Sequence, residues 1–261
     1  MKRFLKTSIV MTLILVSSCS KDFLDYKPTG SVTDDQLNTP TNVEKLTNAA
    51  YAAIGNDEWR TPFTFMWPYG SVRGGDAYKG GGGVGDQVLY DYMEKFNLVT
   101  VDNGRLDEIW VAIYEGIARA NDAMQRMDKL EDASYPLKAQ RWAEMRFIRG
   151  HFHFLAKILF KYVPYIDETV PFADRALVGN RELTNEQLWN KIADDFQAAA
   201  DVLPLTQSQV GRATKAAAWA YLAKVRLFQA YEQDQNNQVT GINAARLNEV
   251  VDLCNKVINT G

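Results

Sequence analysis

Cysteine and histidine are scarce in this sequence of 261 residues, which contains two of each. These two cysteines, Cys19 and Cys254, do not provide the ligand set of a zinc site. His151 and His153 are two positions apart on a predicted helix, so they point to different faces and do not form the i, i+4 pair of a helical metal site. The sequence therefore predicts no metal and no cofactor, and both histidines are predicted to be structural or surface residues.

Motifs for nucleotide binding and for common hydrolases are also missing, because no Gly-x-x-x-x-Gly-Lys-Ser/Thr, Gly-x-Ser-x-Gly or His-Glu-x-x-His occurs. The stretch 71–86 (SVRGGDAYKGGGGVGD) does contain seven glycines, and Gly80, Gly82 and Gly85 formally match Gly-x-Gly-x-x-Gly. That pattern indicates dinucleotide binding only between a strand and a helix, and the preceding residues do not resemble a buried strand. We predict a mobile loop between two helices, where glycines allow positive φ angles and close approach to a ligand.

The N-terminus has the features of an export signal. A basic start is followed by the short apolar run 8–16 and by small residues that lead to Cys19. This run is shorter than the roughly 20 residues that span a bilayer. LVSSC resembles the lipobox of bacterial lipoproteins, which predicts a signal peptide over 1–18 and a lipidated segment over 19–40 that begins at Cys19. The alternative is an ordinary secretory signal with a chance cysteine.

The charge balance argues against nucleic acid as a partner. The whole chain has a formal net charge of -3, and residues 1–18 contain three basic and no acidic side chains, so the chain without them carries -3 - 3 = -6. Binding to nucleic acid depends on Lys and Arg contacts with phosphates. An acidic protein is a poor candidate for that role.

Apolar residues recur with the period of a helix from Thr41 onward. They predict helices at about 41–54, 104–130, 137–160, 185–202, 214–232 and 244–258, and no segment alternates long enough to indicate a sheet core. Trp110 and Trp142 are 32 residues apart, and Trp189 and Trp219 are 30 apart. A recurrence near 34 residues is typical of tetratricopeptide-like helical hairpins, and we expect Trp142, Trp189 and Trp219 to pack in the core. The predicted fold class is all-α, with such hairpins over 41–261 and a Gly-rich aromatic loop inserted.

Charged residues and the second cysteine on these helices are predicted to be structural. Cys254 lies in an apolar helical run and is predicted to be a buried, inert thiol. The neighbouring acids Asp194 and Asp195, like those at 107–108, are predicted to be solvated on helix surfaces. The third long helix carries charges that could form a buried ion network, namely Glu144, Arg146 and Arg149.

Four sequence blocks together resemble one family. They are CSKDFLDYKP at 19–28, YEGIARANDAMQRM at 114–127, WAEMRFIRGHFHFLAKILFKYVPYID at 142–167 and GRATKAAAWAYLAKVRLFQA at 211–230. Their content and order resemble the SusD/RagB-type outer-membrane nutrient-binding lipoproteins. Members of that family are considerably longer, so this sequence looks like the N-terminal, helical-repeat part of such a protein.

The resemblance implies a lipoprotein anchored in the bacterial outer membrane and exposed at the cell surface. It would capture oligosaccharide, or peptide in some members, and deliver it to a SusC-like TonB-dependent transporter for nutrient uptake. Two other classes stay open from the residues alone. One is a lipid-anchored glycoside hydrolase, which needs two separated carboxylates, and the other is a helical adaptor that binds only protein.

A cluster of aromatic residues precedes and enters the glycine stretch. Sugar rings lie on aromatic faces while their hydroxyls bond to polar groups, so such a loop suits a glycan. The candidate ligand-binding residues are Trp67, Tyr69, Asp76 and Tyr78, in the region where the resembled family often contacts ligand. In the alternative reading, Trp67 packs under the loop and Asp76 caps a turn.

Overall fold

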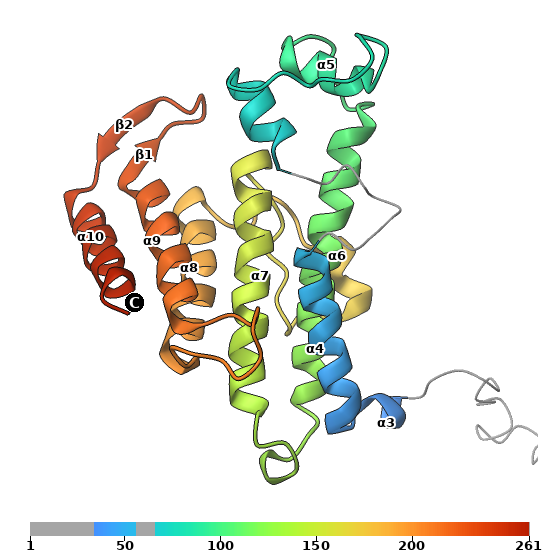
Figure 1. Cartoon of the computed structure of the whole chain (residues 1–261), viewed down its shortest axis with the longest axis vertical. Helices are drawn as coiled ribbons and strands as arrows, with labels where there is room; N and C mark the ends of the chain where they lie inside the picture. The colour runs from blue at the N-terminus through green and yellow to red at the C-terminus, as the bar shows by residue number, and fades with distance from the viewer. Residues whose placement is uncertain (1–33, 56–65, 261) are drawn as a thin grey trace, which may run out of the picture. The chain divides into compact units, whose positions relative to one another are not determined.

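The computed structural model describes residues 34–55 and 66–260 (Figure 1). The predicted signal peptide, Cys19 and most of the segment 19–40 lie outside these residues. The chain divides into two compact units, 1–37 and 38–261. In the first, the short helix α3 (Asp34–Leu37) is described. In the described ranges, no helix has the length and apolar character needed to cross a membrane.

The second unit is built from long helices, as the all-α prediction requires. They are α4 (Pro40–Ile54), α6 (Gly104–Met127), α7 (Lys138–Phe160), α8 (Asn185–Val202), α9 (Lys215–Ala230) and α10 (Ala244–Ile258). From α6 to α10 each helix packs against the one before it, and α4 packs against α6 (Figure 1). This succession of antiparallel neighbours is the tetratricopeptide-like arrangement that the spacing of the tryptophans predicted. Two short 3-10 helices, η2 (Asp132–Ser134) and η3 (Phe172–Leu177), lie in the connections.

Side-chain caps set where most of these helices begin. Each capping oxygen accepts a hydrogen bond from a backbone N–H of the first turn, which would otherwise lack a partner within the helix. Thr184 and Gln187 form a complete capping box at α8. The single caps are Thr39 for α4, Asn103 for α6, Thr214 for α9 and Asn243 for α10. The predicted starts at residues 185 and 244 agree with the structure for this reason.

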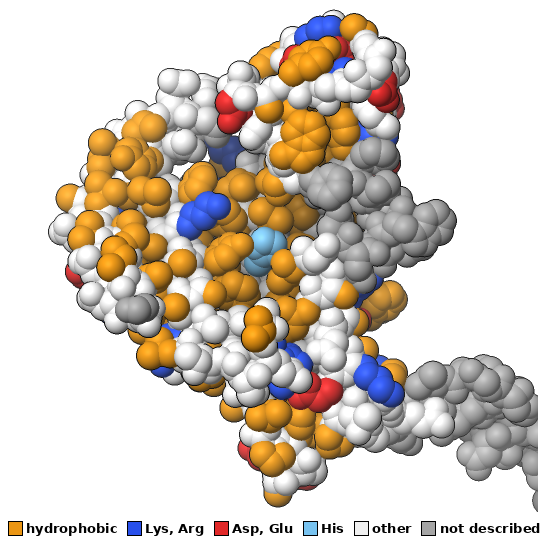
Figure 2. All heavy atoms as spheres, viewed as in Figure 1, with side chains coloured by type: hydrophobic (Ala, Val, Ile, Leu, Met, Phe, Trp, Pro, Cys, Tyr) orange, Lys and Arg blue, Asp and Glu red, His pale blue; other side chains and the backbone are white. Residues whose placement is uncertain are grey.

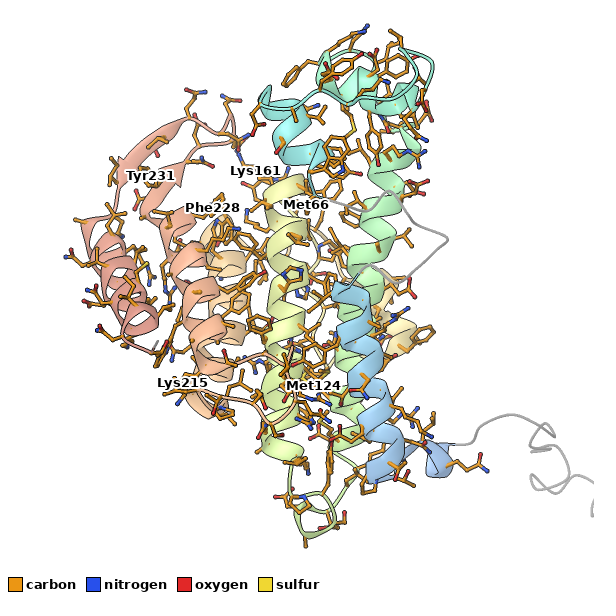
Figure 3. The ribbon with its side chains drawn as sticks, in the orientation of Figure 1. Met66, Met124, Lys161, Lys215, Phe228 and Tyr231 are labelled. Atoms are coloured by element: carbon orange, nitrogen blue, oxygen red, sulfur yellow. The ribbon has the colours of Figure 1, made fainter. Side chains whose placement is uncertain are left out.

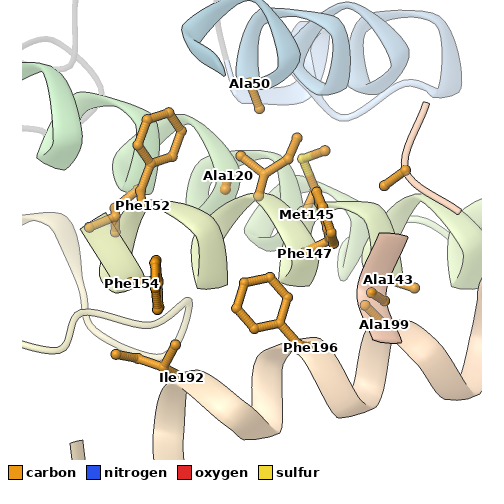
Figure 4. Packing of buried hydrophobic residues seen from close by; sticks show 14 of the residues in the cluster. Ala50, Ala120, Ala143, Met145, Phe147, Phe152, Phe154, Ile192, Phe196 and Ala199 are labelled. Carbon is orange, nitrogen blue, oxygen red and sulfur yellow. The ribbon is translucent and has the colours of Figure 1, made fainter. Parts of the chain in front are cut away.

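The core lies between α4, α6, α7, α8 and α9 and depends on small residues where helices cross. Figure 4 shows Ala120 of α6, Phe152 and Phe154 of α7 and Phe196 of α8 in this layer. Gly116 of α6 lies against the ring of Phe152, where an added Cβ would be 2.2 Å from a ring carbon. Trp142, Trp189 and Trp219 belong to the scaffold as predicted, because Trp189 is buried and the other two pack partly buried against the core. Trp110 packs against the core in the same way.

A buried ion network joins α7 to α8 and corrects one prediction. Asp195 is fully buried instead of solvated. Arg149 donates from Nε and Nη2 to the two oxygens of Asp195 at 3.0 and 2.7 Å, and Tyr165 Oη donates at 2.8 Å. Burial alone would raise the pKa of Asp195, but Arg149 and Arg146 lower it below its usual value. The error arose because adjacent acids need not share a face, and Asp195 points inward while Asp194 stays exposed.

A second buried carboxylate connects α4, α7 and the loop before α9. Glu144 is fully buried. It accepts from Arg141 Nη1 at 2.7 Å and Arg212 Nη1 at 2.9 Å, and Tyr51 Oη donates to it at 3.1 Å. Together with the Asp195 network, these contacts confirm that the charges at 144, 146 and 149 form structural ion pairs.

The end of the chain departs from the prediction in two places. The helix predicted over 214–232 ends at Ala230, and an antiparallel hairpin of β1 (Tyr231–Gln233) and β2 (Val239–Ile242) follows. Lys161, at the end of α7, donates from Nζ to Asp234 O and Gln235 O at the hairpin turn (Figure 3). Cys254 of α10 is exposed, not buried. Among the residues of α10 only the neighbouring Leu253 is buried, because this helix packs mainly against α9.

Candidate functional site

The described residues 66–103, here called the insert, lie between α4 and α6. They contain the five-residue π-helix η1 (Pro68–Val72), the Gly-rich stretch and α5 (Val88–Glu94). The insert is attached to the start of α6 (Figure 1), because Tyr69 Oη donates to Arg105 O at 2.5 Å and the guanidinium of Arg105 lies 5.5 Å from the ring centroid of Tyr90. Met66 and Tyr69 also pack against the core. The helical scaffold therefore presents the insert at one end of α6, where Figure 2 shows hydrophobic and charged side chains side by side at the top of the view.

The Gly-rich stretch closes around a lysine. Lys79 Nζ donates to the carbonyl oxygens of Gly80, Gly83 and Asp86, and the Gly82 N–H donates to Asp86 Oδ2 at 2.9 Å. Gly81 has φ +83° and no room for a Cβ beside Asp86. A phosphate site needs converging N–H donors, whereas here carbonyl oxygens surround an ammonium group. Within the described part of the insert no strand precedes the stretch, so the structure provides no dinucleotide fingerprint.

Three of the four predicted ligand residues are open to solvent on the insert. Trp67 is 42% exposed and Tyr78 is 60% exposed. Asp76 is exposed, and its carboxylate has no hydrogen-bond partner among the residues that the structure describes. Trp67 therefore exposes part of its surface and packs with the rest, and the carboxylate of Asp76 makes no capping bond to a described residue. Their contact with a ligand stays a prediction.

Tyr69 is placed differently from the other three. Its hydroxyl is occupied by Arg105 O, and burial raises its pKa above the usual value. Its ring lines a pocket of about 320 Å³ between the insert and the end of α7, together with Arg73, Met93, Val99, Leu106, Ile158, Leu159 and Phe160. In this structure Tyr69 fixes the insert and offers a ring surface to that pocket.

Exposed apolar residues after α5 were missed by the sequence reasoning. Phe96 is 67% exposed and Leu98 is 58% exposed, and both have positive φ angles. The guanidinium of Arg73 lies 4.4 Å from the ring centroid of Phe96. The sequence carried no signal for this turn, because non-glycine residues with positive φ are uncommon. Lys95 adds a half-exposed cation next to this turn, paired with Asp91 at 2.8 Å.

The two histidines pack against other helices and loops of the scaffold. His153 is fully buried, its Nδ1 lies 3.2 Å from Arg149 O, and its Nε2 accepts from the Ile166 N–H at 3.2 Å. Burial lowers the pKa of His153 to about 3 and that of His151 to about 4. The prediction that both are structural or surface residues is confirmed. In the ranges 34–55 and 66–260, His, Cys, Asp and Glu form no group of three that could hold a metal ion.

The fold and the insert define a helical-repeat protein that presents an aromatic, polar loop at one end of a helical hairpin. A family model described as "Starch-binding associating with outer membrane" matches residues 22–227, so the chain belongs to the SusD-like family. The family resemblance seen in the sequence blocks is thereby confirmed.

Individual relatives agree with this assignment. The SusD-like protein P2 of Formosa agariphila is 29% identical over 231 residues, which cover 87% of this chain and 43% of that protein. Surface glycan-binding protein A of Bacteroides fluxus has a similar fold, with TM-score 0.65, 21% identity, and coverage of 85% of this chain and 44% of that one. A structure determined with xylogluco-oligosaccharide has TM-score 0.62, 24% identity, and coverage of 82% and 40%. This chain spans less than half the length of each.

Proposed function

We propose that this protein captures a glycan at the bacterial surface through the insert. The observation that carries the proposal is the exposure of Trp67 and Tyr78, at 42% and 60%, on a segment held by hydrogen bonds within it and to the start of α6. Large aromatic side chains gain much by burial, so two of them left in solvent beside polar groups favour a binding surface.

The chemistry of the insert suits sugar rings. The C–H face of a pyranose packs on an aromatic ring, while its hydroxyls need both donors and acceptors nearby. Asp76 supplies an acceptor, and Arg73 and Lys95 supply donors on the same insert. The description of the family and the name of the Bacteroides fluxus relative point to the same class of ligand.

We propose capture without cleavage. A glycoside hydrolase needs a carboxylic acid with a raised pKa to protonate the leaving group. The buried carboxylates of Glu144 and Asp195 face arginines, in the manner of structural ion pairs, and the pKa of Asp195 is lowered, so these two groups do not suit that role. Peptide is the alternative ligand, and binding to a peptide is an outcome of the experiment below.

The proposal includes an anchor and a partner. Cys19, outside the described residues, would carry lipid that holds the protein at the outer membrane, where it would deliver glycan to a SusC-like TonB-dependent transporter for nutrient uptake. The family description, which includes association with the outer membrane, supports this. Stable anchoring takes more than one acyl chain. Cys19→Ser removes the attachment point of these chains, so it should move the protein from the membrane fraction to the soluble fraction and abolish labelling with a palmitate analogue. A variant that stays in the membrane fraction and is still labelled would contradict the anchor.

Calorimetric titration of plant, host and microbial polysaccharides tests the ligand site, with Trp67→Ala and Tyr78→Ala as variants. A stacked aromatic contributes about 0.5–1.5 kcal/mol beyond burial, so each change should weaken binding up to about tenfold. The matched control is Phe172→Ala in η3, which removes an aromatic ring that is 81% exposed elsewhere. Release of reducing ends would contradict capture without cleavage. Binding of peptides with no binding of any glycan would overturn the carbohydrate assignment.

A further inference from the structure

A pocket of about 390 Å³ lies where α6 ends and α7 begins. The connection between these two helices is at the opposite end of α6 from the insert (Figure 1). It is lined by Asp128, Asp132, Tyr135, Pro136, Lys138, Ala139 and Trp142. A cavity of roughly 150 Å³ holds a ring of benzene size. This pocket therefore has room for a six-membered ring that carries hydroxyl groups.

The aromatic walls of this pocket are held in place by the scaffold. Trp142 packs partly buried against the core from the beginning of α7. Tyr135 is only 4% exposed, and its hydroxyl donates to Glu44 Oε1 at 2.7 Å. A ring that is already fixed loses little conformational entropy when a ligand stacks on it. The stacking surface open to a ligand is the exposed part of the Trp142 ring, because Tyr135 is almost fully covered.

The polar groups of the pocket include an acceptor without a partner and a fixed donor. Asp128 is exposed, and its carboxylate makes no hydrogen bond or ion pair within residues 34–55 and 66–260. Neighbouring protein atoms still withdraw enough water to raise its pKa. Lys138 Nζ donates to Leu130 O at 2.8 Å and to Asp132 Oδ1 at 2.9 Å, which leaves one N–H of the ammonium group for a ligand.

We propose that this pocket is a second sugar-binding site, which takes one neutral pyranose unit of a glycan. The inference rests on the proposed function for the class of ligand, but it uses none of the residues of the insert. Hydroxyl groups both donate and accept, so they match a free carboxylate beside an ammonium group. An Arg or Lys side chain of a partner protein would suit Asp128 and Trp142, but Lys138 in the same pocket repels it.

The position of the pocket has a consequence for long ligands. The 24 residues of α6 rise about 1.5 Å each, so about 36 Å separates the pocket from the insert. A polysaccharide long enough to reach both sites binds the second one intramolecularly and gains apparent affinity, whereas a short oligosaccharide occupies one site at a time.

Nuclear magnetic resonance of the indole N–H groups tests the proposal on the full chain in detergent. Each tryptophan gives its own signal. The signals of Trp67 and Trp142 are assigned from their absence in the variants Trp67→Phe and Trp142→Phe. The probes are maltoheptaose and a xyloglucan oligosaccharide. We expect the Trp142 signal to shift on titration. In Asp128→Ala, binding seen at Trp142 should weaken about tenfold or more, because a charged acceptor is lost, while the response of Trp67 stays unchanged.

The control is Asp252→Ala, which removes an exposed carboxylate from α10 and should change neither response. Because the Asp128 side chain has no partner in the described part of the chain, its variant should keep the unfolding temperature of the natural protein.

A response at Trp67 without one at Trp142 would overturn the second site and leave the proposed function standing. A response at Trp142 alone would support the second site and count against the insert. No response at either would overturn both, and a response of Trp142 to free arginine but not to sugar would assign the pocket to a cationic partner.

Discussion

Replacement of Asp195 by Asn tests the buried network between α7 and α8. The substitution keeps the shape of the side chain but removes the charge that faces Arg149 and Arg146 and accepts from Tyr165. Removal of one partner from a buried ion pair costs about 3–5 kcal/mol, because the remaining charge stays buried. Arg149 keeps its contacts with Glu168 and Asn121. We therefore expect a loss near the lower end, about 3 kcal/mol in the free energy of unfolding.

Urea denaturation followed by circular dichroism measures this loss of free energy, and thermal unfolding followed by the same signal measures the change in unfolding temperature. For a domain of this size, 1 kcal/mol corresponds to about 2–4 °C, so the unfolding temperature should fall by about 6–12 °C. The matched control is Asp194→Asn, one residue earlier on α8. Its side chain is exposed, so the change should stay within about 0.5 kcal/mol. Equal effects of the two substitutions would refute the assignment of Asp195 to a buried network.

The pH dependence follows from the same contacts. The folded-state pKa of Asp195 is lowered below its unfolded value, so the stability that this group contributes is fully present above about pH 4. It is lost as the pH falls through the folded-state pKa. The difference in stability between the natural protein and Asp195→Asn should therefore be constant near neutral pH and shrink in acid. A difference that grows in acid would contradict the lowered pKa.

Two further predictions concern helix packing and the free cysteine. Gly116→Ala places a Cβ 2.2 Å from a ring carbon of Phe152, so overpacking of about 1–3 kcal/mol should exceed the gain of about 1 kcal/mol in helix propensity. Urea denaturation should show a net loss that Phe152→Leu in the same chain reduces, and unchanged stability would mean that the helices separate freely. Exposed Cys254 should react with a thiol reagent in the folded protein, and reaction only after unfolding would show that it is covered.

Local signals were enough to predict the long helices and several of their ends. The capping box of Thr184 and Gln187 and the cap at Asn243 act within four residues, so the sequence alone places the starts of α8 and α10. The hairpin after α9 was not predicted, because its strands are too short to show alternation. It forms where the turn accepts hydrogen bonds from Lys161, a residue distant in the sequence.

The sequence predicted which segment holds the candidate site, but not which of its side chains are exposed. Aromatic residues beside glycines indicated the insert, and the exposure of Trp67 and Tyr78 agrees with that interpretation. Tyr69 has the same composition signal, but its hydroxyl bonds to Arg105, 36 residues further along the chain. No pattern in the insert itself distinguishes a tyrosine that meets ligand from one that fixes the loop.

The sequence by itself determined the all-α class, the helical repeat and the family, because periodicity, caps and the order of motifs are properties of neighbouring residues. Only the tertiary structure decided which polar groups are buried. Asp194 and Asp195 are chemically identical neighbours, and one is solvated while the other is enclosed by arginines from α7. The pocket between α6 and α7 arose in the same way, since burial and cavities depend on contacts between helices that sequence spacing does not encode.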